Sequence, residues 1–218
     1  MHKKKYDSLI ILIPSFNELN NLKKFIKEIH KRYKVLIIDD CSSDNTSTWL
    51  KKNKINFIKN KKNIGYEQSL IKGLKILSKV KKVEKIITMD ADGQHKMKHI
   101  KKFINVSNNK NPDLIIGSRK KKNRFIESTI SKIFQMKYSL EDPLSGFKLY
   151  KKEKLKKMKF DNFKKFFLVD LVLEFIKKKH KVISINIETN KRFDNPKVGD
   201  LMQTNFKMLS ILVCVILS

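Results

Sequence analysis

The chain has 218 residues, 40% of them hydrophobic, which argues against wholesale disorder and is enough for one domain with a full core. Its formal net charge of +29 favours anionic partners such as nucleic acid, an anionic membrane surface or a phosphorylated substrate, although lysine runs are also typical of solvated faces. The two cysteines, Cys41 and Cys214, exclude the disulfide framework of a small secreted protein.

Strand and helix patterns alternate through the first half of the chain. Short apolar runs predict strands at residues 9–13, 35–38, 55–58, 85–89 and 114–116. Apolar residues at helical spacing predict helices at 22–29, at 44–50 with Asp44 as its cap, at 69–77 and around 100–104. This order is typical of an α/β fold, in which a mostly parallel sheet is flanked by helices on both faces.

The second half is less regular. We expect a helix at 125–138, a strand at 146–150, an apolar helix at 166–176 and a strand at 182–187. No repeat or linker interrupts the chain, so residues 1–197 are predicted to form one domain, followed by a C-terminal helix at 198–218. The apolar run within this helix is too short to span a bilayer. Three alternatives stay open for the helix: the last helix of the core, a helix at the membrane interface, or part of a longer transmembrane segment.

Polar clusters follow four of the predicted strands, at residues 14–18, 39–40, 90–92 and 117–119. The carboxyl ends of parallel strands meet at one edge of an open sheet, and ligands bind there. We therefore expect one cleft that collects five carboxylates and an arginine: Glu18, Asp39, Asp40, Asp90, Asp92 and Arg119. Arginine is scarce in this lysine-rich chain, and it can mark a site that needs a planar, bidentate donor for phosphate.

Asp90-Ala91-Asp92 places two carboxylates two positions apart at a strand end. Mg²⁺ and Mn²⁺ prefer such oxygen ligands together with substrate phosphates, and the cation would neutralise charge on a leaving nucleoside diphosphate. His95 and His99 suggest a zinc pair instead, but the sequence nearby has no Cys or third His to complete a tetrahedral set. Lys61, Lys62 and the Gly65-Tyr66 turn are candidates to approach phosphates, but we favour a solvated loop for them.

Six segments together resemble the family 2 glycosyltransferases, especially the branch with dolichol-phosphate mannosyltransferases and bacterial polyprenyl-phosphate glycosyltransferases. They are residues 13–18 (IPSFNE), 38–46 (IDDCSSDNT), 63–65 (NIG), 89–95 (MDADGQH), 117–119 (GSR) and 142–150 (DPLSGFKLY). The resemblance spans residues 8–197. It implies a GT-A fold, an inverting transfer and a divalent metal, Mg²⁺ or Mn²⁺.

The resemblance also implies roles for individual residues. Those expected to line the nucleoside site are Pro14, Phe16, Glu18, Ile38 and Asp40, and those expected to hold donor diphosphate and metal are Asp90, Ala91, Asp92 and Gln94, with Asp90, Asp92 and Gln94 as metal ligands. Arg119, Arg192 and Lys197 would contact phosphates of donor or acceptor. The catalytic candidates are Asp92, Arg119 and Asp142, the last as a general base beside a hydroxyl acceptor.

The sequence therefore predicts a metal-dependent, inverting glycosyltransferase that uses a GDP- or UDP-linked donor. A shortened stretch at 120–141 and an altered motif at 192–197 leave the acceptor open among polyprenyl phosphate, lipid-linked and saccharide acceptors. Lysine clusters predict a cytoplasmic enzyme that is peripheral on the anionic inner face of the cytoplasmic membrane. A sugar-nucleotide nucleotidyltransferase is disfavoured because residues 14–18 stand where a Gly-rich basic loop is expected. A nucleic-acid binder is disfavoured because no recognition module is present.

Overall fold

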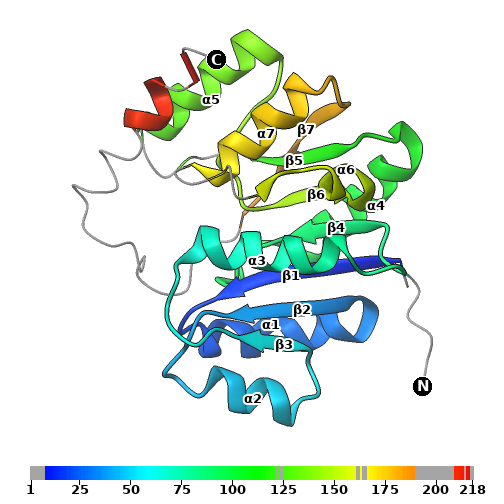
Figure 1. Ribbon diagram of the computed structural model, residues 1–218, viewed down its shortest axis with the longest axis vertical. Helices are drawn as coiled ribbons and strands as arrows, with labels where there is room; N and C mark the ends of the chain where they lie inside the picture. The colour runs from blue at the N-terminus through cyan, green and yellow to red at the C-terminus, as the bar shows by residue number, and fades with distance from the viewer. Residues whose placement is uncertain are drawn as a thin grey trace.

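The computed structural model describes residues 8–120, 122, 125–160, 163, 166–189, 209–213 and 215–216. Within them, one seven-stranded sheet has the strand order β3-β2-β1-β4-β6-β5-β7, and helices cover both of its faces (Figure 1). The predicted α/β fold with a mostly parallel sheet is confirmed.

The strands are β1 (Leu9–Ser15), β2 (Lys34–Asp39), β3 (Phe57–Lys59), β4 (Lys85–Thr88), β5 (Leu114–Arg119), β6 (Lys148–Lys151) and β7 (Val182–Ile187). The helices are α1 (Leu19–Arg32), α2 (Thr46–Lys52), α3 (Tyr66–Ser78), α4 (Met97–Lys110), α5 (Phe125–Tyr138), α6 (Lys152–Lys156) and α7 (Phe167–Lys177). Every element predicted within the described residues is present, and α6 is an additional short helix that the apolar spacing did not indicate.

Strand β6 runs antiparallel to both of its neighbours, β4 and β5, whereas all other strand pairs of this sheet are parallel. Lys148, the first residue of β6, pairs with Thr88, the last residue of β4. The loop that precedes β6 therefore arrives at the edge of the sheet where β1, β2, β4 and β5 end. This reversal adds residues 142–147 to the edge at which the predicted polar clusters meet.

Two apolar clusters fill the two faces of the sheet. Alternate residues of β1 point to opposite faces, as a pleated strand requires: Ile11 and Ile13 pack with α1 and α4, and Leu12 packs with α3 and α7. The strands in the middle of the sheet are buried on both faces, which explains their continuous apolar runs.

The C-terminal helical residues lie beside α5 (Figure 1). Ile211 and Val215 are buried in the cluster that contains α5 and α7, and the Lys137 ammonium donates to the carbonyl oxygens of Val215 and Ile216. One side of this segment is thus part of the core. Among the described residues, no helix combines the length and the apolar character that crossing a membrane requires.

Asp44 serves two helices rather than capping one. The N-cap of α2 is Asn45, in a left-handed conformation, and not Asp44 as predicted. The Asp44 carboxylate accepts hydrogen bonds from the backbone N–H of Thr46, in the first turn of α2, and from that of Leu19, the first residue of α1. It therefore ties the loop after β1 to the loop after β2.

Gly73 allows α3 to lie directly on β1. A Cβ atom there would clash with both terminal methyl groups of Leu12, at 2.8 Å from Cδ2. We expect Gly73→Ala to lower the free energy of unfolding by about 1 kcal/mol, because the cost of overpacking exceeds the gain in helix propensity. In a Leu12→Ala background the same substitution should stabilise the protein. Urea denaturation of the four proteins measures this, and equal losses in both backgrounds would contradict it.

Candidate active site

A pocket of about 420 Å³ opens at the carboxyl edge of the sheet, a size typical of small-molecule sites. It is bordered by the ends of β1, β2, β4 and β5 and by the start of α3. The residues that line it are Pro14, Ser15, Phe16, Glu18, Asp40, Asn63, Gly65, Tyr66, Ser69, Asp90, Ala91, Asp92, Gln94 and Arg119. The four polar clusters that follow separate strands therefore do meet in one place.

Not every predicted site residue reaches this pocket. Ile38 is fully buried in an apolar cluster, and Asp39 is buried with its carboxylate accepting hydrogen bonds from the Ser42 N–H and the Ser47 hydroxyl. Both belong to the framework beneath the site, so four carboxylates line the pocket instead of five. Arg192 and Lys197 lie outside the described residues.

Asp40 organises the loop that precedes α3. Its carboxylate, almost fully buried, accepts hydrogen bonds from the backbone N–H groups of Ile64 and Gly65 at 2.9 and 2.8 Å and from the Asn60 amide at 2.7 Å. The solvated loop favoured for the Gly65-Tyr66 turn was wrong, because both residues line the pocket together with Asn63. The predicted contact between Asp40 and the nucleoside stays a prediction.

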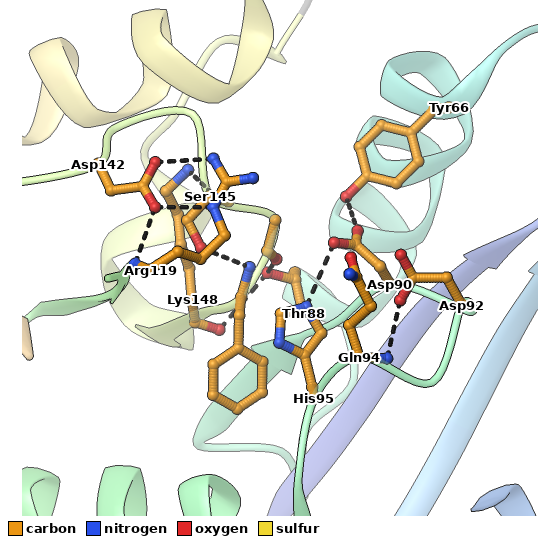
Figure 2. Close-up of polar contacts among 12 residues, drawn as sticks. Tyr66, Thr88, Asp90, Asp92, Gln94, His95, Arg119, Asp142, Ser145 and Lys148 are labelled. Atoms are coloured by element: carbon orange, nitrogen blue, oxygen red, sulfur yellow. Dashed lines mark hydrogen bonds and ion pairs between the residues drawn. The ribbon is translucent and has the colours of Figure 1, made fainter. Parts of the chain in front are cut away.

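Asp90, the first acid of the motif, is held from two sides (Figure 2). The Tyr66 hydroxyl donates to its Oδ1 at 2.6 Å, and His95 Nε2 lies 3.2 Å from its Oδ2. Burial alone would raise the pKa of Asp90, but the hydrogen bond and charge of His95, together with the Tyr66 hydroxyl, lower it to about 2. Burial and the Asp90 charge raise the pKa of Tyr66 well above its ordinary value, so its hydroxyl stays a donor.

Asp92 and Gln94 lie beside Asp90 in the pocket. Asp92 Oδ1 accepts a hydrogen bond from the Gln94 N–H at 3.0 Å, which folds the short loop after β4 back toward the pocket (Figure 2). No cluster of three or more His, Cys, Asp or Glu side chains suited to a metal ion occurs in the described part of the chain. Two carboxylates and an amide fit Mg²⁺ or Mn²⁺, which take few protein ligands and complete their shell with water and substrate phosphates.

Arg119 occupies the other end of the pocket and is paired with Asp142. Its Nε and Nη2 donate to the two carboxylate oxygens at 2.8 and 2.9 Å, a bidentate arrangement, and its backbone N–H donates to the same carboxylate at 3.0 Å. Nη2 also lies 3.4 Å from Glu127 of α5. Burial alone would lower the pKa of Arg119, but hydrogen bonds and charge from Asp142 raise it, so the guanidinium stays charged.

Asp142 is buried behind Arg119 and is not among the residues that line the pocket. It adopts a left-handed backbone conformation, and its N–H donates to the Ser131 hydroxyl of α5 at 3.0 Å. Its carboxylate already receives three hydrogen bonds from Arg119. The structure therefore shows Asp142 as the residue that positions Arg119, and its predicted role as a general base stays a prediction.

Lys148 is fully buried beneath the loop of residues 142–147. Its ammonium donates to the carbonyl oxygens of Pro143, Ser145 and Leu168 at 2.8, 2.7 and 3.3 Å, and burial lowers its pKa to about 7 (Figure 2). Such contacts satisfy all three donors of a lysine without a carboxylate. Lys148 thus fixes the loop that carries both Asp142 and Gly146.

Sequence reasoning missed Tyr66, His95 as a neighbour of Asp90, Glu127, Gly146 and Lys148. Gly146 and Lys148 belong to a segment that resembled the family, so their position was signalled although their contacts were not. Tyr66 directly follows the Asn63-Ile64-Gly65 segment, which is the one signal that could have placed it at the site.

Comparison with known proteins identifies the family. A model described as Glycosyl transferase family 2 matches residues 10–170, so the chain belongs to this family and is a glycosyltransferase. An uncharacterised protein of Methanocaldococcus jannaschii is 36% identical over 172 residues, which cover 70% of this chain and 75% of that protein. The UDP-N-acetylglucosamine--dolichyl-phosphate N-acetylglucosaminyltransferase of Methanococcus voltae is 30% identical over 133 residues, about half of either chain.

Solved structures show the same fold. Glucosyl-3-phosphoglycerate synthase from Mycobacterium tuberculosis, in complex with Mn²⁺, uridine diphosphate and glucosyl-3-phosphoglycerate, superposes with a TM-score of 0.72. The match covers 97% of this chain and 79% of that chain at 12% identity. The predicted GT-A fold is therefore confirmed.

The Arg119–Asp142 pair gives a prediction about stability. We expect Asp142→Asn to lower the free energy of unfolding by about 3 kcal/mol, because a largely buried guanidinium loses the carboxylate that binds it in a bidentate manner and keeps only the longer contact with Glu127. Glu188→Gln is the matched control, since its ion pairs with Lys96 and Lys98 lie at the surface, where water screens them, and their loss should lower the free energy of unfolding far less. Urea denaturation of both variants measures the difference, and similar small losses would contradict the structural role of Asp142.

Proposed function

We propose that this glycosyltransferase moves a sugar, with inversion, from a nucleoside-diphosphate sugar to a lipid-linked phosphate in a reaction that needs Mg²⁺ or Mn²⁺. The observation that carries the proposal is that one pocket brings together the acids that would hold a metal and an arginine. A sugar-transfer site of this kind needs a place for the nucleoside, a cation for the diphosphate and a charge for the acceptor.

The nucleoside end is formed by Phe16, Glu18 and Asp40, which line the pocket at the ends of β1 and β2. The Phe16 ring is 42% exposed, which leaves a face against which a base can stack. Asn17 is bonded to the loop after β2 through Ser42 and Ser43, so the two loops hold one shape. A rigid wall of this kind supports recognition of a nucleoside, and GDP- and UDP-linked donors both remain candidates.

The metal site is formed by Asp90, Asp92 and Gln94, whose oxygen atoms would hold Mg²⁺ or Mn²⁺ against the donor diphosphate. The bound cation would stabilise the charge that develops on the leaving nucleoside diphosphate. Asp92 and Asp90 act by holding that cation. Ala91, between them, is small enough to let the ligand approach the backbone.

The ion pair between Asp142 and Arg119 favours a phosphate acceptor. A hydroxyl acceptor needs a general base. The Asp142 carboxylate is bound by Arg119, and the acids that line the pocket belong to the proposed metal and nucleoside sites. A phosphate oxygen is already anionic and needs no base, while the Arg119 guanidinium can orient it. The dolichyl-phosphate relative from Methanococcus voltae supports the same class of acceptor.

A membrane surface would present such an acceptor, and α5 offers a face for docking. Phe125 and Met136 are 90% and 85% exposed, and their separation of 11 residues, about three turns, places them on one side of the helix. Leu209, Val213 and Ile216 of the adjacent C-terminal segment are exposed too. Exposed apolar side chains on a strongly basic protein, with the exposed Lys132 between Phe125 and Met136, fit the inner, anionic face of a cytoplasmic membrane.

Donor binding can be tested by thermal unfolding. We expect a UDP- or GDP-sugar to raise the melting temperature only when Mn²⁺ is present, and a ligand at 100 times its Kd adds about 2.7 kcal/mol of stability. Asp92→Ala should abolish both this shift and sugar transfer, whereas Glu153→Ala, an exposed acid on α6, should leave them unchanged. Full transfer activity in Asp92→Ala would refute the proposal. Pyrophosphate release from a nucleoside triphosphate and a sugar phosphate would instead favour a nucleotidyltransferase.

Membrane docking can be tested by sedimentation with lipid vesicles. We expect the protein to bind vesicles that contain phosphatidylglycerol, and the double variant Phe125→Ser/Met136→Ser to bind about tenfold more weakly, because two apolar side chains no longer leave water. Val80→Ser removes an exposed apolar side chain in the loop after α3 and should bind as the unaltered protein does. Undiminished binding of the double variant would rule out α5 as the docking face.

A further inference from the structure

The orientation of the Asp90 carboxylate is set by residues that neither its own motif nor the proposed function includes. Tyr66, whose hydroxyl reaches Asp90 (Figure 2), comes from the first turn of α3. Gly146 comes from the loop before β6. Both segments are distant from Asp90 in the sequence. Together with His95 they contact or closely approach both oxygen atoms of the carboxylate.

The backbone of Gly146 lies directly against this carboxylate. A Cβ atom at residue 146 would overlap Asp90 Oδ1, and it would lie 2.9 Å from Oδ2 and 2.5 Å from the Tyr66 hydroxyl oxygen. Two hydrogen bonds oppose a shift of this backbone away from Asp90. The Thr88 hydroxyl donates to the Gly146 carbonyl oxygen at 2.7 Å, and the Lys148 ammonium donates to the Ser145 carbonyl oxygen. Residue 146 must therefore lack a side chain if Asp90 and Tyr66 are to meet.

Tyr66 is held in place from behind. Its neighbours Ile64 and Gly65 donate their backbone N–H groups to Asp40, so the nucleoside end of the pocket fixes the start of α3. The Tyr66 ring lines the pocket and is 38% exposed, while its hydroxyl reaches Asp90 Oδ1. A chain of contacts thus runs from Asp40 through the start of α3 to Asp90.

We propose that Tyr66 is a positioning residue for the metal ligand Asp90, and that Gly146 is required because it makes room for their contact. A carboxylate can rotate about its Cβ–Cγ bond, and a hydrogen bond to each oxygen removes that freedom before the cation arrives. Partners behind metal ligands commonly change metal affinity by about 10- to 100-fold when they are removed. The inference rests on the proposed metal site and extends it to two residues outside the motif.

The test is calorimetric titration of Mn²⁺ into the full chain without nucleotide. We expect Tyr66→Phe to weaken Mn²⁺ binding about tenfold and Gly146→Ala to weaken it at least as much. In the double variant the fold decrease in Mn²⁺ affinity should be smaller than the product of the two single decreases. The reason is that Tyr66→Phe removes the oxygen atom that would press against the new methyl group. With a sugar nucleotide, raising the Mn²⁺ concentration should restore the transfer rate of Tyr66→Phe, which a purely structural defect would not allow.

Two matched variants separate this role from general damage. Gly73→Ala introduces the same methyl group into α3 against Leu12 and should change stability but not Mn²⁺ affinity. Tyr138→Phe removes a hydroxyl group from α5, away from the pocket, and should change neither greatly. Equal Mn²⁺ affinity in Tyr66→Phe and the unaltered protein would overturn the inference, even if sugar transfer is observed. Weakened Mn²⁺ binding without any sugar transfer would support the inference and count against the proposed function.

Discussion

The reversed direction of β6 is the constraint on which the site depends. In a purely parallel sheet, the loop that leads into each strand lies at the edge opposite the ligand. Because β6 is antiparallel and lies between β4 and β5, its preceding loop enters at the same edge as the ends of these two strands. That loop brings Asp142 against Arg119 at the end of β5, and Gly146 against Asp90 just after β4. One short loop thus contacts both Arg119 and Asp90 of the pocket.

Lys148 explains how this loop keeps its shape. A lysine without a carboxylate partner is rarely buried, because removing its charge from water is costly. Here three carbonyl oxygens replace the water, two from the loop and one from α7, and the loop is joined to the helix layer through a single side chain. The high lysine content of the chain hides this role, since nothing in the composition separates Lys148 from lysines on solvated faces.

The sequence could predict the fold and most of the pocket, because both follow from local patterns. Apolar periodicity marked the strands, and acids placed at strand ends marked the edge where ligands bind, so Glu18, Asp40, Asp90, Asp92 and Arg119 were found in advance. Contacts between distant segments could not be predicted in this way. The direction of β6 is not encoded in its apolar pattern, and without it nothing indicates that Asp142 would be used by Arg119 or that Gly146 would touch Asp90.

The charges around the pocket explain why a divalent cation belongs to the proposed reaction. Four acids line the pocket against one arginine, and Asp142 and Glu127 already offset the charge of that arginine. A nucleoside diphosphate is itself an anion, so the acids of this pocket would repel it. The lysines on the outer surface would weaken this repulsion only slightly, because salt screens exposed charges. The cation that we propose for Asp90 and Asp92 would reverse the sign of the interaction at the position of the diphosphate. In the proposed reaction the excess of lysine would draw anionic ligands toward the protein, while selection among them would depend on the few fixed charges inside the pocket.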